Sequence, residues 1–179
     1  AEDGIRDDLV TGVQTCALPI CTIDVANFSL TSAGAVTGSD VIIVDNLLQI
    51  VATTGSSDIT LDNSANQLNR ISLDSTAGSA TIFDTSDIEL VDVDLGGLVL
   101  LTTGDITDGG AEVEVHGLAN LVTTTSGNIN LGNAPLQFEQ VSMTGNQISL
   151  TQQGDVMLNS VNANGTLSIS SVTGNIGTG

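Results

Sequence analysis

The sequence predicts an all-β fold, a parallel β-helix (β-solenoid) with coils of about 20 residues. Three observations support this prediction: one short phrase recurs along the chain, apolar and polar residues alternate, and aromatic residues are almost absent. Self-similarity on this scale is typical of stacked repeats, in which each coil buries its apolar residues against its neighbours.

The recurring phrase begins with two or three alternating apolar residues and a Thr or Ser step. Three positions follow: Gly, then Asp or Asn, then Ile or Val. Its clearest copies run over residues 98–106, 148–156 and 167–176, and weaker copies over 121–129 and 48–59. Irregular spacing of around twenty residues fits a solenoid of about seven coils with loop insertions at one corner. The apolar landmarks after Asp or Asn fall at 41, 59, 88, 106, 129, 148 and 176.

The composition predicts an aliphatic interior. The chain has 179 residues, 40% of them hydrophobic, yet it holds three Phe and no Trp or Tyr. Ile, Leu and Val recur too often for a disordered acidic tail, so the chain can fill a core. A core without aromatic volume suits a narrow and regular interior.

The strand predictions follow from alternation of apolar and polar residues in short runs rich in Val, Ile and Thr, bounded by Gly, Asn, Asp or Ser. We expect the glycines and Asn or Asp residues to supply left-handed or tight corner conformations. No stretch shows a 3.6-residue period, so little or no helix is expected. The candidate strands are 23–30, 40–44, 47–52, 58–61, 70–73, 80–83, 88–93, 98–101, 112–115, 120–123, 128–131, 137–143, 147–150, 155–158, 166–169 and 174–176.

An antiparallel β-sandwich is the alternative fold. Asn164-Gly165 between Val161 and Leu167 is a good two-residue hairpin signal. Sandwiches usually bury a Trp or Tyr and do not restate one phrase, so the solenoid is the preferred interpretation.

The charge balance excludes two classes of partner. The chain carries 21 acidic residues against 2 basic ones, a formal net charge of −19. Phosphate contacts need Lys and Arg, so nucleic acid is not an expected partner. Docking to an anionic membrane surface is equally disfavoured. No apolar run approaches the ~18 residues of a membrane span, so we expect no membrane insertion by this segment.

The first 20 residues share none of the repeat. Back-translated, they match a sequencing adapter through every residue, with an index-sized gap at Asp8-Leu9, and the first base of the Cys21 codon belongs to it too. We therefore expect residues 1–21 to be a non-native, adapter-derived leader and residues 22–179 to be a repeat segment truncated at both ends. A signal peptide does not fit, because the stretch lacks a basic n-region and a long apolar h-region.

Calcium is the cofactor that the acidic residues suggest. Asp92-x-Asp94-x-Gly-Gly resembles the start of an EF-hand loop, but the twelfth position is Thr103 where that loop has Glu. Carboxylates stacked on successive coils would also repel one another, which a divalent cation relieves. The weak calcium candidates are Asp92, Asp94, Asp105 and Asp108. A calcium-stabilised repeat module is therefore an alternative function, and a solvated acidic face without a defined metal site is the preferred interpretation.

Catalysis is the other alternative, since some β-helices act on polysaccharides. Glycoside hydrolysis needs two carboxyl groups at a defined separation. Gripping sugar also takes basic and aromatic side chains, which are scarce here, so we expect no enzyme and no catalytic residue. His116 is the only histidine. Without a Cys or Ser partner at a motif spacing it makes neither a triad nor a zinc site, and we expect it to be structural or incidental. The available carboxylate pairs are Asp84/Asp87, Asp92/Asp94 and Asp105/Asp108.

The L-x-L-x-(S/T)…G-(D/N)-I phrase, with almost no Lys, Arg, Cys or aromatic residues, resembles the filamentous haemagglutinin type of large bacterial surface adhesins. The resemblance covers residues 22–179 as a texture of composition and repeat. It implies a right-handed parallel β-helix and a structural, non-catalytic shaft segment of a secreted or surface-displayed adhesin, located outside the cell or on its surface. The implied partners are neighbouring coils of the same adhesin and host or surface glycans or proteins. The Asn-Pro-Asn signatures of the family's secretion domain are missing.

Overall fold

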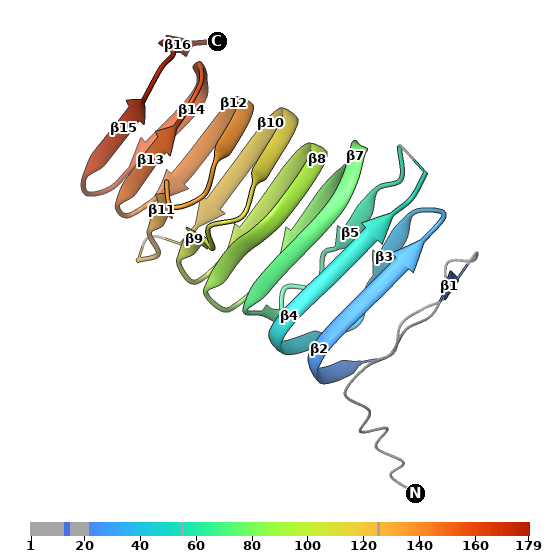
Figure 1. Ribbon diagram of the computed structural model, residues 1–179. Helices are drawn as coiled ribbons and strands as arrows, with labels where there is room; N and C mark the ends of the chain where they lie inside the picture. Colours follow the sequence, from blue (N-terminus) through green and yellow to red (C-terminus); the bar gives the residue numbers. More distant parts are fainter. Residues whose placement is uncertain (1–12, 15–21, 55, 125) are drawn as a thin grey trace, which may run out of the picture.

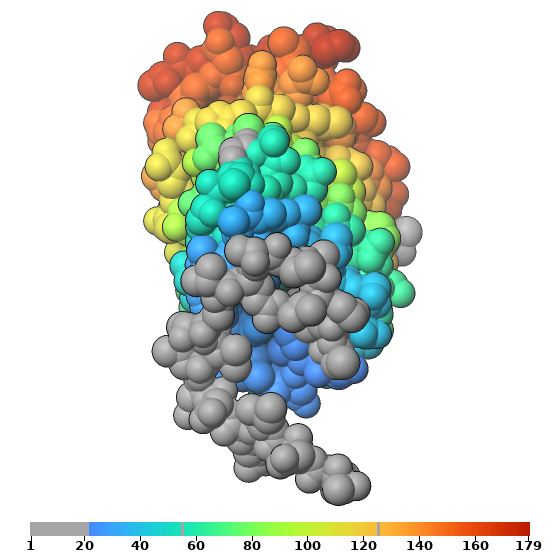
Figure 2. Space-filling view, turned by 90° about the vertical axis from the view of Figure 1, so that its right-hand side faces the viewer, coloured from blue at the N-terminus to red at the C-terminus, as the bar shows by residue number. Residues whose placement is uncertain are grey.

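The computed structural model describes residues 13–14, 22–54, 56–124 and 126–179. These residues form strands and no helix, and the strands stack in parallel as a β-solenoid of about eight turns with roughly 20-residue coils (Figure 1). Every strand pair among them is parallel, so the all-β solenoid is confirmed and the antiparallel β-sandwich alternative is wrong. The coils follow one another along the stack in chain order, which the colour sequence in Figure 2 shows.

The strands of the described residues are β1 (Val13–Gln14), β2 (Ile23–Ser32), β3 (Val36–Gly38), β4 (Ile42–Ala52), β5 (Ile59–Leu61), β6 (Gln67–Leu68), β7 (Arg70–Phe83), β8 (Ile88–Thr102), β9 (Ile106–Asp108), β10 (Val113–Thr123), β11 (Ile129–Leu131), β12 (Leu136–Gly145), β13 (Ile148–Gln152), β14 (Val156–Ala163), β15 (Leu167–Ser171) and β16 (Ile176–Thr178).

Several strands are longer than predicted, because they run through a corner without interruption. β7, β8 and β10 each join two predicted strands into one bent strand, with a register shift where the chain turns. β3, β6 and β9 were not predicted, and each is only two or three residues long. The predicted leader lies outside the described residues except for β1, which pairs with Thr31 and Ser32 of β2.

Each coil has three faces, and the inward residues of each face stack in register from coil to coil. The first face holds the start of β8 and the short strands β9, β11, β13 and β15. The short strands β3 and β5 lie on the third face, and the long strands supply the rest of the second and third faces. One inward column per face is Ile88–Ile106–Ile129–Ile148–Leu167, then Leu73–Val93–Val113–Leu136, then Ala80–Leu98–Ala119–Val141–Leu158.

The interior is aliphatic, as the composition predicted. Its buried hydrophobic side chains are Ile, Leu, Val, Ala and Met, together with the aromatic Phe138. Burial depends on having a coil on both sides: Ile148 and Leu150 are each 1% exposed, whereas Leu167 and Ile176 of the last described coil are 53% and 49% exposed. Neighbouring coils therefore supply the burial that holds each coil together.

The recurring phrase marks corners, and the structure places its copies at all three. Leu100 to Ile106 turns from the third face to the first, Leu150 to Val156 from the first to the second, and Ile50 to Ile59 from the second to the third. The equivalence of the landmarks was therefore wrong in part: Ile59 pairs with Ala80, and Ile176 pairs with Val156. The use of different corners explains the two longest gaps, before Ile88 and Ile176. Ile106 and Ile129 share one column and are still 23 residues apart, so the coils also differ in length.

Of the left-handed or tight corner conformations that we predicted, Gly104 and Gly127 of the phrase show the tight one, because they allow neighbouring coils to approach closely. Among the described residues, no residue other than glycine has a positive φ, and the phrase glycines have none. A Cβ at Gly104 would lie 2.5 Å from the backbone nitrogen of Asp87, and one at Gly127 would lie 2.5 Å from the carbonyl oxygen of Gly104. Any side chain there would push neighbouring coils apart. Gly110, with φ of 87°, is a genuine left-handed position outside the phrase.

Replacing Ile106 tests the stacking. Its side chain is fully buried in the first-face column. Ile106→Ala should lower the free energy of unfolding by about 2–5 kcal/mol. Ile106→Asp should abolish the fold, because it buries an unpaired charge. Circular dichroism with thermal melting measures both effects. Val99→Asp, at an outward position 39% exposed, is the matched control and should melt close to the parent; an unchanged melt of Ile106→Asp would contradict the stacking.

Candidate functional site

The Asp or Asn of the phrase binds the next coil. The Oδ1 atom of Asp87 accepts the backbone N–H of Asp105 at 2.8 Å, and Oδ1 of Asp105 accepts that of Asn128 at 2.7 Å. Oδ1 of Asn128 in turn accepts the N–H of Gln147 at 3.2 Å. Each donor occupies the same place in its coil as the acceptor does in the coil before. This side chain therefore continues the parallel ladder around a corner where the strands break.

The same bond recurs at the other two corners. Oδ1 of Asp58 accepts the N–H of Ser79 at 2.9 Å, and Oδ1 of Asp155 accepts that of Asn175 at 2.7 Å. The Asp or Asn position of the phrase is thus a coil-to-coil acceptor in each copy that a further described coil follows. This explains why Asp and Asn interchange, since both offer an Oδ1 atom.

The Thr of the phrase binds in the opposite direction. The hydroxyl of Thr103 donates to the carbonyl of Thr85 at 2.7 Å, and the hydroxyl of Thr124 donates to the carbonyl of Thr103 at 3.0 Å. Thr54 makes the equivalent bond to Ala33 at 2.6 Å. The polar residues of the phrase therefore contact neighbouring coils rather than a common exterior site.

Buried polar side chains complete the interior turns. Asp84 is 3% exposed and accepts the N–H of Leu68 at 2.7 Å, while its other oxygen accepts from the backbone and hydroxyl of Ser86. Burial raises the pKa of Asp84 above its ordinary value, and the hydrogen bonds from Ser86 and Leu68 only partly oppose this. Asp108 is 5% exposed and accepts the N–H groups of Gly132 and Ala134. Both carboxylates serve the fold.

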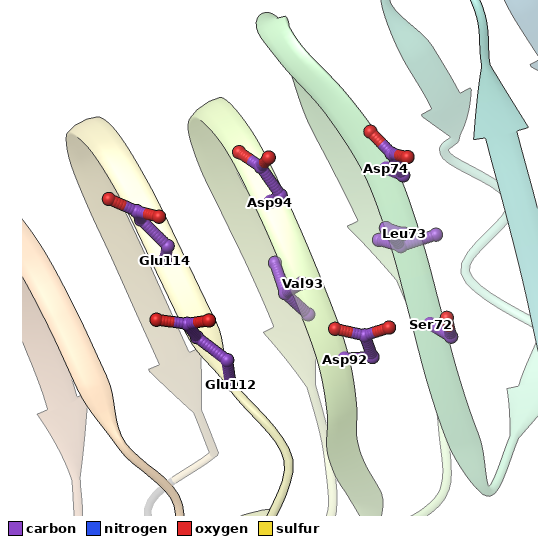
Figure 3. Close-up of a pocket in the computed structure, with 8 residues that line it drawn as sticks. All are labelled: Ser72, Leu73, Asp74, Asp92, Val93, Asp94, Glu112 and Glu114. Carbon is purple, nitrogen blue, oxygen red and sulfur yellow. The ribbon is translucent and has the colours of Figure 1, made fainter.

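An acidic face lies on the outward side of β7, β8 and β10. Asp74, Asp94 and Glu114 stand directly opposite one another on successive strands. Asp92 and Glu112 lie in the row beside them, and these five carboxylates line one hollow with Ser72, Leu73 and Val93 (Figure 3). Like charges directly opposite one another destabilise a sheet. The acidic face, meaning these five carboxylates, therefore favours a bound cation electrostatically.

His116 borders the acidic face. Its Nε2 atom lies 3.0 Å from Oδ1 of Asp94, and its Nδ1 atom lies 3.6 Å from Oε1 of Glu114. Asp94 is held on its other side, where Oδ2 accepts the hydroxyl of Thr76 at 3.1 Å. One ligand atom from each of Asp94, Glu114 and His116 lies within 4.8 Å of the others. The three side chains together make a mixed nitrogen and oxygen donor set.

The structure separates the four calcium candidates into two groups. Asp92 and Asp94 lie on the acidic face, whereas Asp105 binds the next coil and Asp108 caps an interior turn. Sequence reasoning did not find the contacts of His116, because its partner Asp94 is 22 residues away along the chain, while Glu114 is two residues away. Acidic residues recurring every 20 positions, at 74, 94 and 114, were the available signal.

Among the described residues, no helix is long and apolar enough to cross a membrane. Parallel coils, corner acceptors and an aliphatic interior define the chain as a repeat β-solenoid. The chain belongs to the family described as repeats of unknown function (DUF5649), which matches residues 8–74 and 77–144. The first match begins within the predicted leader, whose origin stays a prediction. Comparison with curated proteins and with solved structures gives no match.

Asp105 offers a matched pair of substitutions for the corner bond. Asp105→Ala leaves the N–H of Asn128 without its acceptor and should lower the free energy of unfolding by about 1–3 kcal/mol. Asp105→Asn keeps an Oδ1 acceptor, as Asn128 does naturally for Gln147, and should cost much less. Urea unfolding measures both variants. Equal losses for Ala and Asn would show that the carboxylate charge matters and the acceptor does not.

Asp84 should make stability depend on pH. Because its pKa is raised in the folded state above the ordinary value of 3.8, the native protein holds this proton more tightly than the unfolded chain does. The stabilisation from Asp84 is therefore complete below about pH 3.8 and is lost as the pH rises through the folded-state pKa. Urea unfolding at pH 3 and pH 7 should show a larger advantage of the parent over Asp84→Ala at pH 3. A larger advantage at pH 7 would contradict this.

Proposed function

We propose that the chain is a structural, non-catalytic shaft segment of a large secreted or surface-displayed bacterial adhesin, acting outside the cell or on its surface. The observation that carries the proposal is the use of the phrase: its Leu and Ile pack inward, its Thr binds the coil before, and its Asp or Asn binds the coil after. The repeated chemistry joins coils, which is what a rod requires.

The charge supports the same proposal. A stack of coils offers parallel strand edges at its ends, which are templates for uncontrolled pairing. Because the formal net charge is −19, such stacks repel one another, which opposes this uncontrolled pairing. The resemblance to haemagglutinin-type adhesins supplies the proposed setting: neighbouring coils of the same adhesin as partners, with glycans or proteins of a host or surface as further partners.

The carboxylate pairs give the enzyme alternative little support. Asp87 and Asp105 bind backbone of the next coil, and Asp84 and Asp108 are buried in interior turns. The pair that points outward without a backbone partner is Asp92 and Asp94. The hollow that it borders contains no Arg, Lys or aromatic side chain among its lining residues to grip a sugar.

Pulling the chain by its two ends in a single-molecule force experiment tests the shaft proposal. Since each coil is held by its neighbours, we expect stepwise extension, with steps of one coil, roughly 20 residues or about 70 Å of extended chain. Asp105→Ala should lower the force of the steps. One all-or-none event at low force would contradict the proposal. Release of sugar products from polysaccharides that is lost in Asp92→Asn and Asp94→Asn would also contradict it.

A further inference from the structure

We propose that Asp94, Glu114 and His116 form a binding site for one divalent transition-metal ion of the zinc class. The site lies on two neighbouring coils: Asp94 stands on β8 directly opposite Glu114 on β10, and His116 follows two positions along β10. Their ligand atoms lie within 4.8 Å of one another without any change of the backbone. The inference goes beyond the shaft role and does not rest on it.

The imidazole provides the argument that acidic residues alone do not. Both ring nitrogens of His116 face carboxylate oxygens, at 3.0 Å from Asp94 and 3.6 Å from Glu114. A neutral imidazole has one N–H donor and one lone pair. In this neutral form one of the two contacts sets a lone pair against a carboxylate oxygen, which is repulsive, whereas the protonated ring would donate at both nitrogens. A metal ion bound to that nitrogen, and shared with the carboxylates, turns the repulsion into coordination.

The surroundings of the three ligands favour the same ion. Thr76 donates to Oδ2 of Asp94 and leaves Oδ1 directed at His116, so the carboxylate is already oriented. Asp74, Asp92 and Glu112 add negative charge to the adjoining hollow, and no basic side chain lines it. A divalent cation would relieve the repulsion between carboxylates that stand opposite one another on successive strands.

The donor set selects the type of metal. Calcium takes six to eight oxygen ligands and makes little use of imidazole. One imidazole with two carboxylates suits zinc and similar ions, with water filling the remaining positions. The inference therefore differs from a calcium site on the acidic face: it requires His116, whereas diffuse binding of calcium does not.

Isothermal titration of the full chain with ZnCl2 tests the site, in a background carrying Cys16→Ser and Cys21→Ser so that thiolates do not contribute. We expect saturable binding of one ion. His116→Ala should weaken it by about tenfold or more, and His116→Gln serves if the alanine variant fails to fold by circular dichroism. Asp92→Asn is the matched control: it removes one charge from the same face without removing a proposed ligand, and should weaken binding less than about threefold.

Nuclear magnetic resonance of the imidazole gives a second readout, because His116 is the only histidine in the chain. One equivalent of Zn²⁺ should shift the nitrogen resonance of the bound ring atom, and Ca²⁺ should not. Absence of saturable zinc binding would overturn the proposal. So would equal weakening by His116→Ala and Asp92→Asn, or equal responses to Zn²⁺ and Ca²⁺, since these results describe counterions spread over the acidic face.

Discussion

Burial between neighbouring coils is the constraint on which the structure depends. A single coil of roughly 20 residues has an inside but no second layer to cover its edges. Ile148 and Leu150, with coils on both sides, are buried, whereas Leu167 and Ile176 in the last described coil are half exposed. Each fully buried Ile or Leu contributes about 1.5–3 kcal/mol. Stability is therefore shared between adjacent coils, and an aliphatic ladder with little aromatic volume is sufficient.

The corners solve the problem that this stacking creates. Strands pair along the faces, but backbone N–H groups at a corner lose their ladder partners and need others. Asp or Asn accepts the N–H of the next coil, Thr returns a bond to the coil before, and Gly removes the side chain that would hold the coils apart. Three positions of the phrase therefore build a corner, and each of them serves a separate contact between neighbouring coils. Outward positions are free of these demands, and there the acidic face and His116 are found.

Much of the fold was predictable from the sequence, because inward stacking leaves a period-two pattern and corners leave a repeated phrase. The equivalence of the corners was not: Ile59 and Ile176 follow the same phrase as Ile106 but lie on other faces. The interior turns could not be predicted from the sequence either, because Asp84 and Asp108 are not part of the repeated phrase. The backbone N–H groups that they cap come near them only in the folded chain.

The candidate site was the least predictable part. Asp92 and Asp94 were recognised as an acidic pair, but their grouping with carboxylates one coil away depends on coil length. His116 was expected to be structural or incidental, because no partner lay at a motif spacing along the chain. Its partner Asp94 is adjacent only through the register that pairs β8 with β10. Sequence motifs describe neighbours along one coil, whereas this site is built across two.

The register of the coils is tested most directly by disulfide trapping. Thr107 and Asn130 stand opposite each other on β9 and β11, so their Cα atoms lie about 4.8 Å apart, within disulfide reach. Ser149 stands opposite Asn130 on the next coil, which places it about 9.6 Å from Thr107 and out of reach. In a background without Cys16 and Cys21, Thr107→Cys with Asn130→Cys should oxidise to an intramolecular disulfide, and Thr107→Cys with Ser149→Cys should not. Trapping of the second pair, or failure of the first, would contradict the stacked-coil account.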